Sequence, residues 1–195
     1  MAPAATSRQT VRWQEVALVL AVAVAYRAVC VAVIGDHPLF VNPVVDAGYH
    51  HHWALRILAG DLFGHGPDDV FKPPLYPCFL ALCDKFFGEQ VAVAQWLQHL
   101  LGAASCVLLT MLAGRFMDRK SALVAGLIAA LYAPFAFFES QLLSPALTLF
   151  LTLAAMLALL AAMSREGGDG RQVWQWGGLA GLLFGLSAGV RPDVL

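Results

Sequence analysis

Long apolar runs separated by short polar segments dominate the sequence. Each run is close to the length of a helix that crosses a lipid bilayer, which needs about 20 apolar residues. The runs cover residues 16–34, 90–117, 122–138, 143–163 and 174–190. The pattern therefore predicts an all-α membrane protein with about five transmembrane helices, rather than a soluble domain with a large core.

One connector, residues 35–89, is long enough to hold a functional site outside the bilayer. It contains two segments with helical character, at residues 46–59 and 74–87. In the first, residues that recur at steps of four, three and four share one helix face, namely Asp46, His50, Trp53 and Ile57. This face is polar at its start and apolar further along, as is typical of a helix in the membrane interface. We therefore expect two interfacial helices in the first outer loop.

Composition and charge narrow the functional classes. Hydrophobic residues make up 59% of the chain and charged residues only 13%, about half the charged fraction of an average soluble domain. The net charge of -1 offers no basic surface for nucleic acid. The four cysteines form no Cys-x-x-Cys metal motif. Cys78 and Cys83 lie five residues apart on a predicted helix and face different directions, so we expect no disulfide between them.

Lysines and arginines are distributed unequally between the two sides of the predicted bundle. With a cytoplasmic N-terminus, seven lie inside and four outside, which is the usual bias toward the cytoplasm. The inner set is Arg8, Arg12, Arg115, Arg119, Lys120, Arg165 and Arg171, and the outer set is Arg56, Lys72, Lys85 and Arg191. The first apolar run exceeds the ~7–15 residues of a signal-peptide core, so it predicts an uncleaved anchor. We expect an integral protein of a plasma membrane, such as the bacterial inner membrane, with the long loop outside.

Two motifs in the outer loop resemble a known family. "DAGYHHHWALRIL" followed by "FKPPLYPCFLALCDKFFG" is similar to the first outer loop of glycosyltransferases that use polyprenyl-phosphate sugars. These are the multi-span GT-C enzymes related to protein O-mannosyltransferases and lipid A aminoarabinose transferases (family 39-like). The similarity extends through "ESQLLSPALTLFL" and "GLSAGVRP". It implies transfer of a sugar from a polyprenyl-phosphate donor to an outer acceptor, with residues 1–195 as the N-terminal part of a longer enzyme and residues 35–89 as its catalytic loop.

The resemblance implies roles for five residues. Asp46 corresponds to an acid at the reacting centre, and Lys72 to a lysine that contacts the lipid-linked phosphate. The resemblance also implies substrate contacts for Tyr49, Glu139 and Arg191. Simpler alternatives remain open for three of them. Asp46 can act as a helix N-cap, Lys72 can contact ordinary lipid headgroups, and Glu139 can be an ordinary residue at the end of a span.

The sequence leaves the use of a divalent cation open and assigns no other cofactor. The polyprenyl-phosphate sugar is the donor substrate. Some relatives carry an acidic metal ligand just before the lysine, where this chain has Phe71. Asp46 and His50, four residues apart, can still share a divalent cation. His51 and His52 diverge from His50 by about 100° per residue on a helix, so the three histidines cannot all bind one ion.

A different functional class remains as an alternative. Arg27 lies within the first predicted span, where an arginine is costly and usually functional. We expect it to pair with a polar neighbour, such as Gln95, Gln98 or His99. The alternative interpretation is half of a transporter or channel, with Arg27, His99 and Glu139 along a polar pathway. The spans lack the paired segments broken by glycine or proline that are typical of transporter sites, which argues against this alternative. A structural fragment without activity is a third possibility.

Overall fold

The computed structural model describes residues 11–61, 72–165 and 170–191. The described residues are helical apart from turns and connectors. The helices are α1 (Trp13–Ile34), α2 (Pro38–Val41), α3 (Asp46–Leu58), α4 (Leu75–Phe87), α5 (Val91–Ala113), α6 (Arg119–Ala130), α7 (Ala133–Glu139), α8 (Pro145–Met163) and α9 (Gly170–Val190). The protein is therefore an all-α membrane protein, as the hydrophobic pattern predicts.

Four helices, α1, α5, α8 and α9, are long and apolar enough to cross a membrane. The third predicted span is not one straight helix. It consists of α6 and α7, which meet at a bend of 48° and together pass as a fifth span. Pro134 lies in the first turn of α7, a position where its missing N–H costs no helical hydrogen bond, whereas a continuous helix would lose one. The described residues thus contain four or five spans, in agreement with the predicted number, and the third of them is bent.

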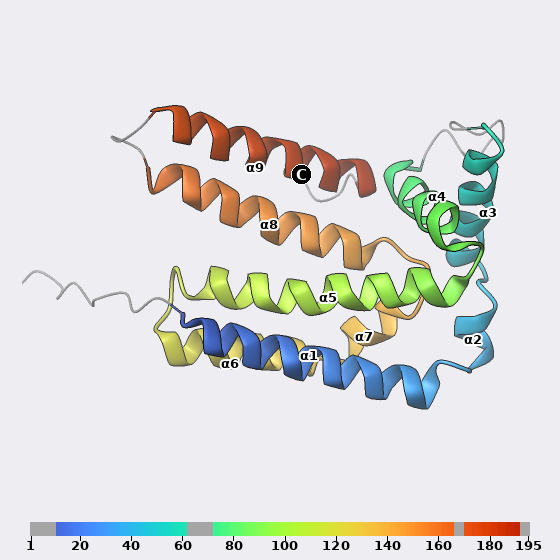
Figure 1. Ribbon diagram of the computed structural model, residues 1–195, viewed down its shortest axis with the longest axis horizontal. Coiled ribbons are helices and arrows are strands. Elements are labelled where there is room, and N and C mark those ends of the chain that lie inside the picture. Colours follow the sequence, from blue (N-terminus) through green and yellow to red (C-terminus); the bar gives the residue numbers. More distant parts are fainter. Residues whose placement is uncertain (1–10, 62–71, 166–169, 192–195) are drawn as a thin grey trace, which may run out of the picture.

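The spanning helices lie roughly along one axis, and α5 is central among them (Figure 1). It packs against α1, α6 and α8, while α8 packs against α9. Small residues allow this close approach, as is usual between helices in membranes. At Gly126 of α6, a Cβ would lie 1.9 Å from the Thr110 hydroxyl of α5. Large apolar side chains such as Val29, Ile128 and Leu182 point outward, where lipid would cover them.

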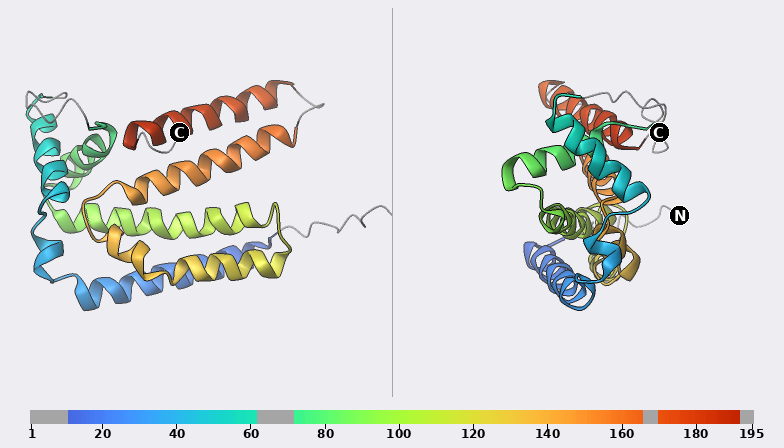
Figure 2. Two further views of the ribbon diagram at one scale, coloured as in Figure 1. Left: turned by 180° about the vertical axis from the view of Figure 1, so that it is seen from behind. Right: turned by 90° about the vertical axis from the view of Figure 1, so that its right-hand side faces the viewer.

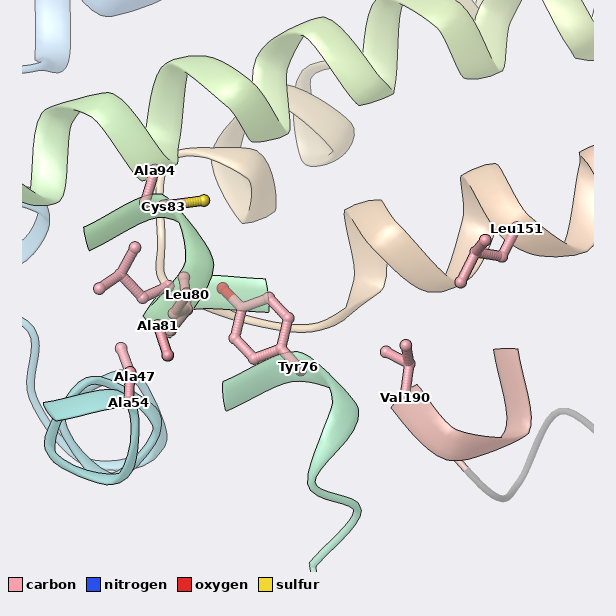
Figure 3. Packing of buried hydrophobic residues seen from close by; sticks show 10 residues of the cluster. Ala47, Ala54, Tyr76, Leu80, Ala81, Cys83, Ala94, Leu151 and Val190 are labelled. Atoms are coloured by element: carbon pink, nitrogen blue, oxygen red, sulfur yellow. The ribbon is translucent and has the colours of Figure 1, made fainter. Parts of the chain in front are cut away.

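The two segments of the predicted outer loop form α3 and α4, which lie across one end of the bundle (Figures 1 and 2). The sequence did not predict α2, a single turn that Pro38 begins. An apolar cluster joins α3 and α4 to the ends of the bundle helices, and it includes Ala54, Tyr76, Ala94, Leu151 and Val190 (Figure 3). The turn between α5 and α6, the last turn of α8 and the first turn of α9 lie at the opposite end (Figure 1). The loop with the candidate chemistry and the arginine-rich turns are thus at opposite ends.

Candidate active site

Asp46 and Lys72 form an ion pair at the end of the bundle that carries α3 and α4. Lys72 Nζ lies 3.1 Å from Asp46 Oδ1, although 26 residues separate them in the chain. The Asp46 side chain is 66% exposed and that of Lys72 is 37% exposed. The Lys72 ammonium also lies 4.0 Å from the centre of the Tyr49 ring, within the range of a cation–π interaction. The structure therefore brings three of the predicted site residues together, with a carboxylate open to a ligand.

The backbone before Asp46 is unusual. Val45 is the N-cap residue of α3 and has a φ of +54°, a conformation that β-branched residues rarely adopt. Two residues after Asp46, a Cβ on Gly48 would lie 2.9 Å from the carbonyl oxygen of Pro43. The chain therefore makes a tight entry into α3 that requires glycine at this position. Strain of this kind costs about 1–3 kcal/mol and tends to occur at functional sites.

The structure argues against the capping alternative for Asp46. Asp46 is the first helical residue and not the N-cap, and no side chain caps this end of α3. Its carboxylate pairs with Lys72 instead. A negative charge in the first turn still interacts favourably with the helix dipole. Asp46 therefore stabilises α3 in part, but it does so without the hydrogen bond that would make it a cap.

His50 is held in a neutral form beside this pair. Its ring packs edge-on against Tyr76, with ring centres 4.9 Å apart, and its buried Nδ1 has no hydrogen-bond partner. The pKa of His50 is lowered to about 4, chiefly by burial and also by the positive charge of Lys72, with Asp46 acting in the opposite direction. A neutral imidazole can accept a proton or hydrogen bond from a substrate.

The described residues offer no complete metal site. No three histidine, cysteine, aspartate or glutamate side chains in the described ranges come close enough together to hold an ion. Asp46 and His50 could supply two ligands at most. His52 is exposed, as expected from its divergence from His50 on the helix. Phe71, the position where relatives carry an acid, lies outside the described residues.

Sequence reasoning missed Tyr76, which links the site to the bundle. Tyr76 is fully buried, and its hydroxyl donates a hydrogen bond to Gln98 Oε1 on α5. The two Gln98 Nε2 protons go to the carbonyl oxygens of Glu139 and Gln141, at 2.8 and 2.6 Å. Burial raises the pKa of the Tyr76 phenol well above its ordinary value, so it remains a donor. The Lys-Pro-Pro-Leu-Tyr-Pro motif contains this tyrosine, but its partner on α5 gave no signal in the sequence.

Arg27 pairs with Glu139, which was not among the three neighbours that the sequence suggested. Its Nε and Nη2 each lie 2.7 Å from an oxygen of Glu139, in a two-pronged pair with side chains only 2% and 5% exposed. His99 Nδ1 lies 3.0 Å from the same carboxylate. A Cβ on Gly102 would lie 1.9 Å from Glu139 Oε1, so glycine makes room for the pair. The proposed partners Gln95 and Gln98 instead bond to backbone carbonyls.

The contacts among Arg27, Glu139 and His99 affect two predictions, namely substrate binding by Glu139 and the transporter alternative. The Glu139 carboxylate is engaged by Arg27 and His99 inside the bundle, and it is not part of the Asp46–Lys72 cluster. Its predicted contact with substrate thus has no geometric support here. Arg27, Glu139 and His99, which form the polar pathway of the transporter alternative, are bonded to one another inside the bundle. The bend between α6 and α7 gives one broken span among the described helices, whereas the earlier argument concerned a pair of broken spans.

Arg191 lies just past α9, at the same end of the bundle as α3 and α4. Its backbone N–H donates to the carbonyl oxygen of Ser187 at 2.9 Å, and the residue is exposed. Near it, a Cβ on Gly189 would lie 3.6 Å from the Leu75 side chain of α4. The end of α9 therefore lies beside the start of α4, three residues after Lys72 in the chain.

Comparison with known families identifies the class of protein. The family model described as dolichyl-phosphate-mannose-protein mannosyltransferase matches residues 71–194. The chain belongs to this family. It is thus a membrane glycosyltransferase of the GT-C type, and the match favours this class over the transporter alternative. Neither the curated proteins nor the solved structures gave a match.

The matched region contains some of the candidate residues of this glycosyltransferase and omits others. Lys72, Glu139 and Arg191 lie inside it, whereas Asp46 and Tyr49 precede its first residue. The family match by itself therefore says nothing about Asp46. The link between Asp46 and the matched region is geometric, because its carboxylate pairs with Lys72.

Proposed function

We propose that this glycosyltransferase moves a sugar from a polyprenyl-phosphate donor to an acceptor at the outer face of the membrane, with Asp46 as general base. The observation that carries the proposal is the ion pair between Asp46 and Lys72. It joins a carboxylate that is accessible to an acceptor with a cation that is accessible to a phosphate. The pair stands at the end of the bundle where the sequence motifs concentrate.

Lys72 supplies the positive charge for the donor. The lipid phosphate leaves the sugar with increased negative charge, and a nearby ammonium stabilises that charge more in the transition state than in the ground state. Lys72 is 37% exposed and held by Asp46 and the Tyr49 ring. It is therefore oriented, yet it can contact a phosphate without a large rearrangement. Arg191 is a second cation at this end of the bundle and is proposed to contact the same donor.

Asp46 takes the proton from the acceptor. A sugar phosphate already contains a fair leaving group, so the reaction needs one base that activates the incoming hydroxyl. Direct attack by that hydroxyl, on the side of the sugar opposite to the phosphate, inverts the anomeric centre. The contact with Lys72 orients the Asp46 carboxylate at the exposed end of the bundle. Within this scheme the neutral His50 ring, held against Tyr76, orients the site.

The proposed membrane side follows from charge. The turn between α5 and α6, the end of α8 and the start of α9 lie at the end opposite to α3 (Figure 1). These segments carry Arg115, Arg119, Lys120, Arg165 and Arg171. Basic turns prefer the cytoplasm, so the Asp46 end is proposed to face outward. The lipid tail of the donor then remains in the bilayer while its phosphate reaches Lys72 at the surface.

The test is sugar transfer by the full enzyme in membranes, with a labelled polyprenyl-phosphate sugar as donor. We expect Asp46→Asn to retain its fold and insertion but to lose roughly 10²–10⁴-fold in rate, because the amide cannot accept the proton. Glu89→Gln is a matched control, since Glu89 is an exposed acid at the same end of the bundle. Transfer by Asp46→Asn within a few-fold of wild type would show that Asp46 is not the base.

A second measurement tests Lys72 separately. Lys72→Ala should weaken binding of the donor while binding of the acceptor stays near normal, because only the donor carries the phosphate. Lys85→Ala serves as the control, as Lys85 is an exposed lysine near the end of α4. Unchanged donor affinity in Lys72→Ala would assign Lys72 to ordinary lipid headgroups instead.

A further inference from the structure

A second site lies apart from the Asp46–Lys72 pair. A cavity of about 140 Å³ opens between α1, α2 and α5, and its lining includes Asp36, Phe40, Gln95, Trp96, His99 and Ser140. Asp46, Tyr49 and Lys72 do not line it. A cavity of about 150 Å³ holds a benzene molecule, so this one accommodates a small head group but not a whole lipid or glycan.

The polar atoms of this cavity are mainly acceptors. Both Nε2 protons of Gln95 are used, in hydrogen bonds of 2.7 Å to the carbonyl oxygens of Phe40 and Ser140. Its Oε1 therefore remains as an acceptor. The carboxylate of Asp36 is exposed and has no hydrogen bond or ion pair with the described part of the chain. Gln95 Oε1 and the two carboxylate oxygens of Asp36 are therefore three acceptors that can bind hydrogen-bond donors of a ligand.

His99 adds a further acceptor. Its Nδ1 donates to Glu139 Oε2 at 3.0 Å, so in the neutral ring Nε2 is an acceptor. The nearest hydroxyl, that of Ser140, lies 3.3 Å from Nε2 but 2.9 Å from the carbonyl oxygen of Ala136. Ser140 has one proton for these two acceptors, and the shorter contact is to the carbonyl. Nε2 is thus left to accept from a ligand.

The charge of the cavity excludes anions. None of the described lysines and arginines lines it, and the nearby Arg27 is already paired with both oxygens of Glu139. Asp36 contributes a negative charge, and the exposed Trp96 ring offers a face that attracts cations. A phosphate would be repelled here, in contrast to the surroundings of Lys72. The ligand must therefore donate hydrogen bonds and carry either no charge or a positive one.

We propose that this cavity binds a primary ammonium head group of the ethanolamine type. An ammonium has three donors and no acceptor, which complements Asp36, Gln95 and His99. Its single charge is balanced by Asp36 and its short carbon chain contacts Phe40 and Trp96. The phosphate of such a lipid would remain outside the cavity. A trimethylammonium head has no N–H, so it cannot donate a hydrogen bond to these acceptors.

The experiment measures lipid retention and does not depend on sugar transfer. The purified protein in a nonionic detergent is mixed with dihexanoyl phosphatidylethanolamine or, separately, dihexanoyl phosphatidylcholine, and bound lipid is counted by native mass spectrometry. We expect the ethanolamine lipid to be retained about tenfold better, as for one charge-assisted hydrogen bond gained. Asp36→Asn should remove this preference, and Glu89→Gln should leave it intact. Asp36 is exposed, so its substitution does not threaten the fold.

Two results would overturn the proposal. They are equal retention of both lipids by the unmodified protein, and an unchanged preference in Asp36→Asn. Trp96→Leu provides an independent check, because loss of the cation–π contact should weaken retention even with Asp36 present. Competition by free ethanolamine shows whether the cavity recognises the head group alone or requires the whole lipid. Displacement shows that the head group alone is recognised, and no displacement shows that the lipid is required.

Discussion

The buried pair between Arg27 and Glu139 gives the sharpest test of how this fold is held together. Both bonds measure 2.7 Å and the side chains are 2% and 5% exposed. Removing one partner of such a pair leaves an uncompensated buried charge and costs about 3–5 kcal/mol in soluble proteins. Polar contacts between membrane helices average only about 0.6 kcal/mol, with a maximum near 1.7. The two ranges of free energy therefore predict different losses of stability when one partner of the Arg27–Glu139 pair is replaced.

We expect the larger effect for Arg27→Met, which keeps most of the side-chain volume. Glu139 also accepts from His99, so it cannot move to water without breaking a second bond. A loss of about 3 kcal/mol in the free energy of unfolding corresponds to roughly 6–12 °C in Tm for a domain of this size. The double variant Arg27→Met/Glu139→Leu removes both charges and should recover most of the loss, because apolar replacement of a whole buried pair is often neutral.

Thermal unfolding in detergent measures both variants, and Arg115→Met is the control because Arg115 is exposed at the other end of the bundle. Its effect should stay within about 0.5 kcal/mol. The reasoning is refuted if Arg27→Met costs less than about 1 kcal/mol, the range of ordinary membrane contacts. The single variant Glu139→Leu completes the comparison. The reasoning is also refuted if the double variant loses as much stability as Arg27→Met and Glu139→Leu together, since coupled partners are not additive.

Further predictions concern packing, pH, orientation and metal. Gly102→Ala should lower Tm by several degrees, because its Cβ would lie 1.9 Å from a buried carboxylate, whereas Gly177→Ala, with nothing within 4 Å, should not; equal effects would contradict the close packing. The folded pKa of His50 lies near 4, below the ordinary 6.5, so the unfolded chain binds more protons between these values and stability should fall as the pH drops from 6.5 to 4. A flatter pH profile in His50→Gln would confirm this, and an unchanged one would reject it. In a background without native cysteines, an impermeant thiol reagent added outside cells should label Glu89→Cys and not Arg115→Cys; the reverse would invert the proposed topology. Transfer activity should survive chelation, and loss with rescue by one divalent ion would show a metal site.

Much of the fold followed from local composition. A run of about 20 apolar residues has few options other than a spanning helix, because its backbone must satisfy its own hydrogen bonds in lipid. The predicted runs at residues 16–34 and 143–163 accordingly match α1 and α8 within three residues. The helical steps between Asp46 and Ile57 likewise predicted α3. The sequence did not predict the break at residues 131–132, where Pro134 allows a new helix to begin and the contacts of Glu139 fix the position of α7.

The sequence by itself determined the class of fold and the motifs of residues 35–89. The tertiary structure decided which of these residues meet. Asp46 and Lys72 are 26 residues apart, and Arg27 and Glu139 are 112 apart. Hydropathy reports how deep a residue lies in the membrane, but partners depend on which helix faces adjoin. That choice rests on small residues such as Gly102, where the missing side chain makes room for a carboxylate from another helix.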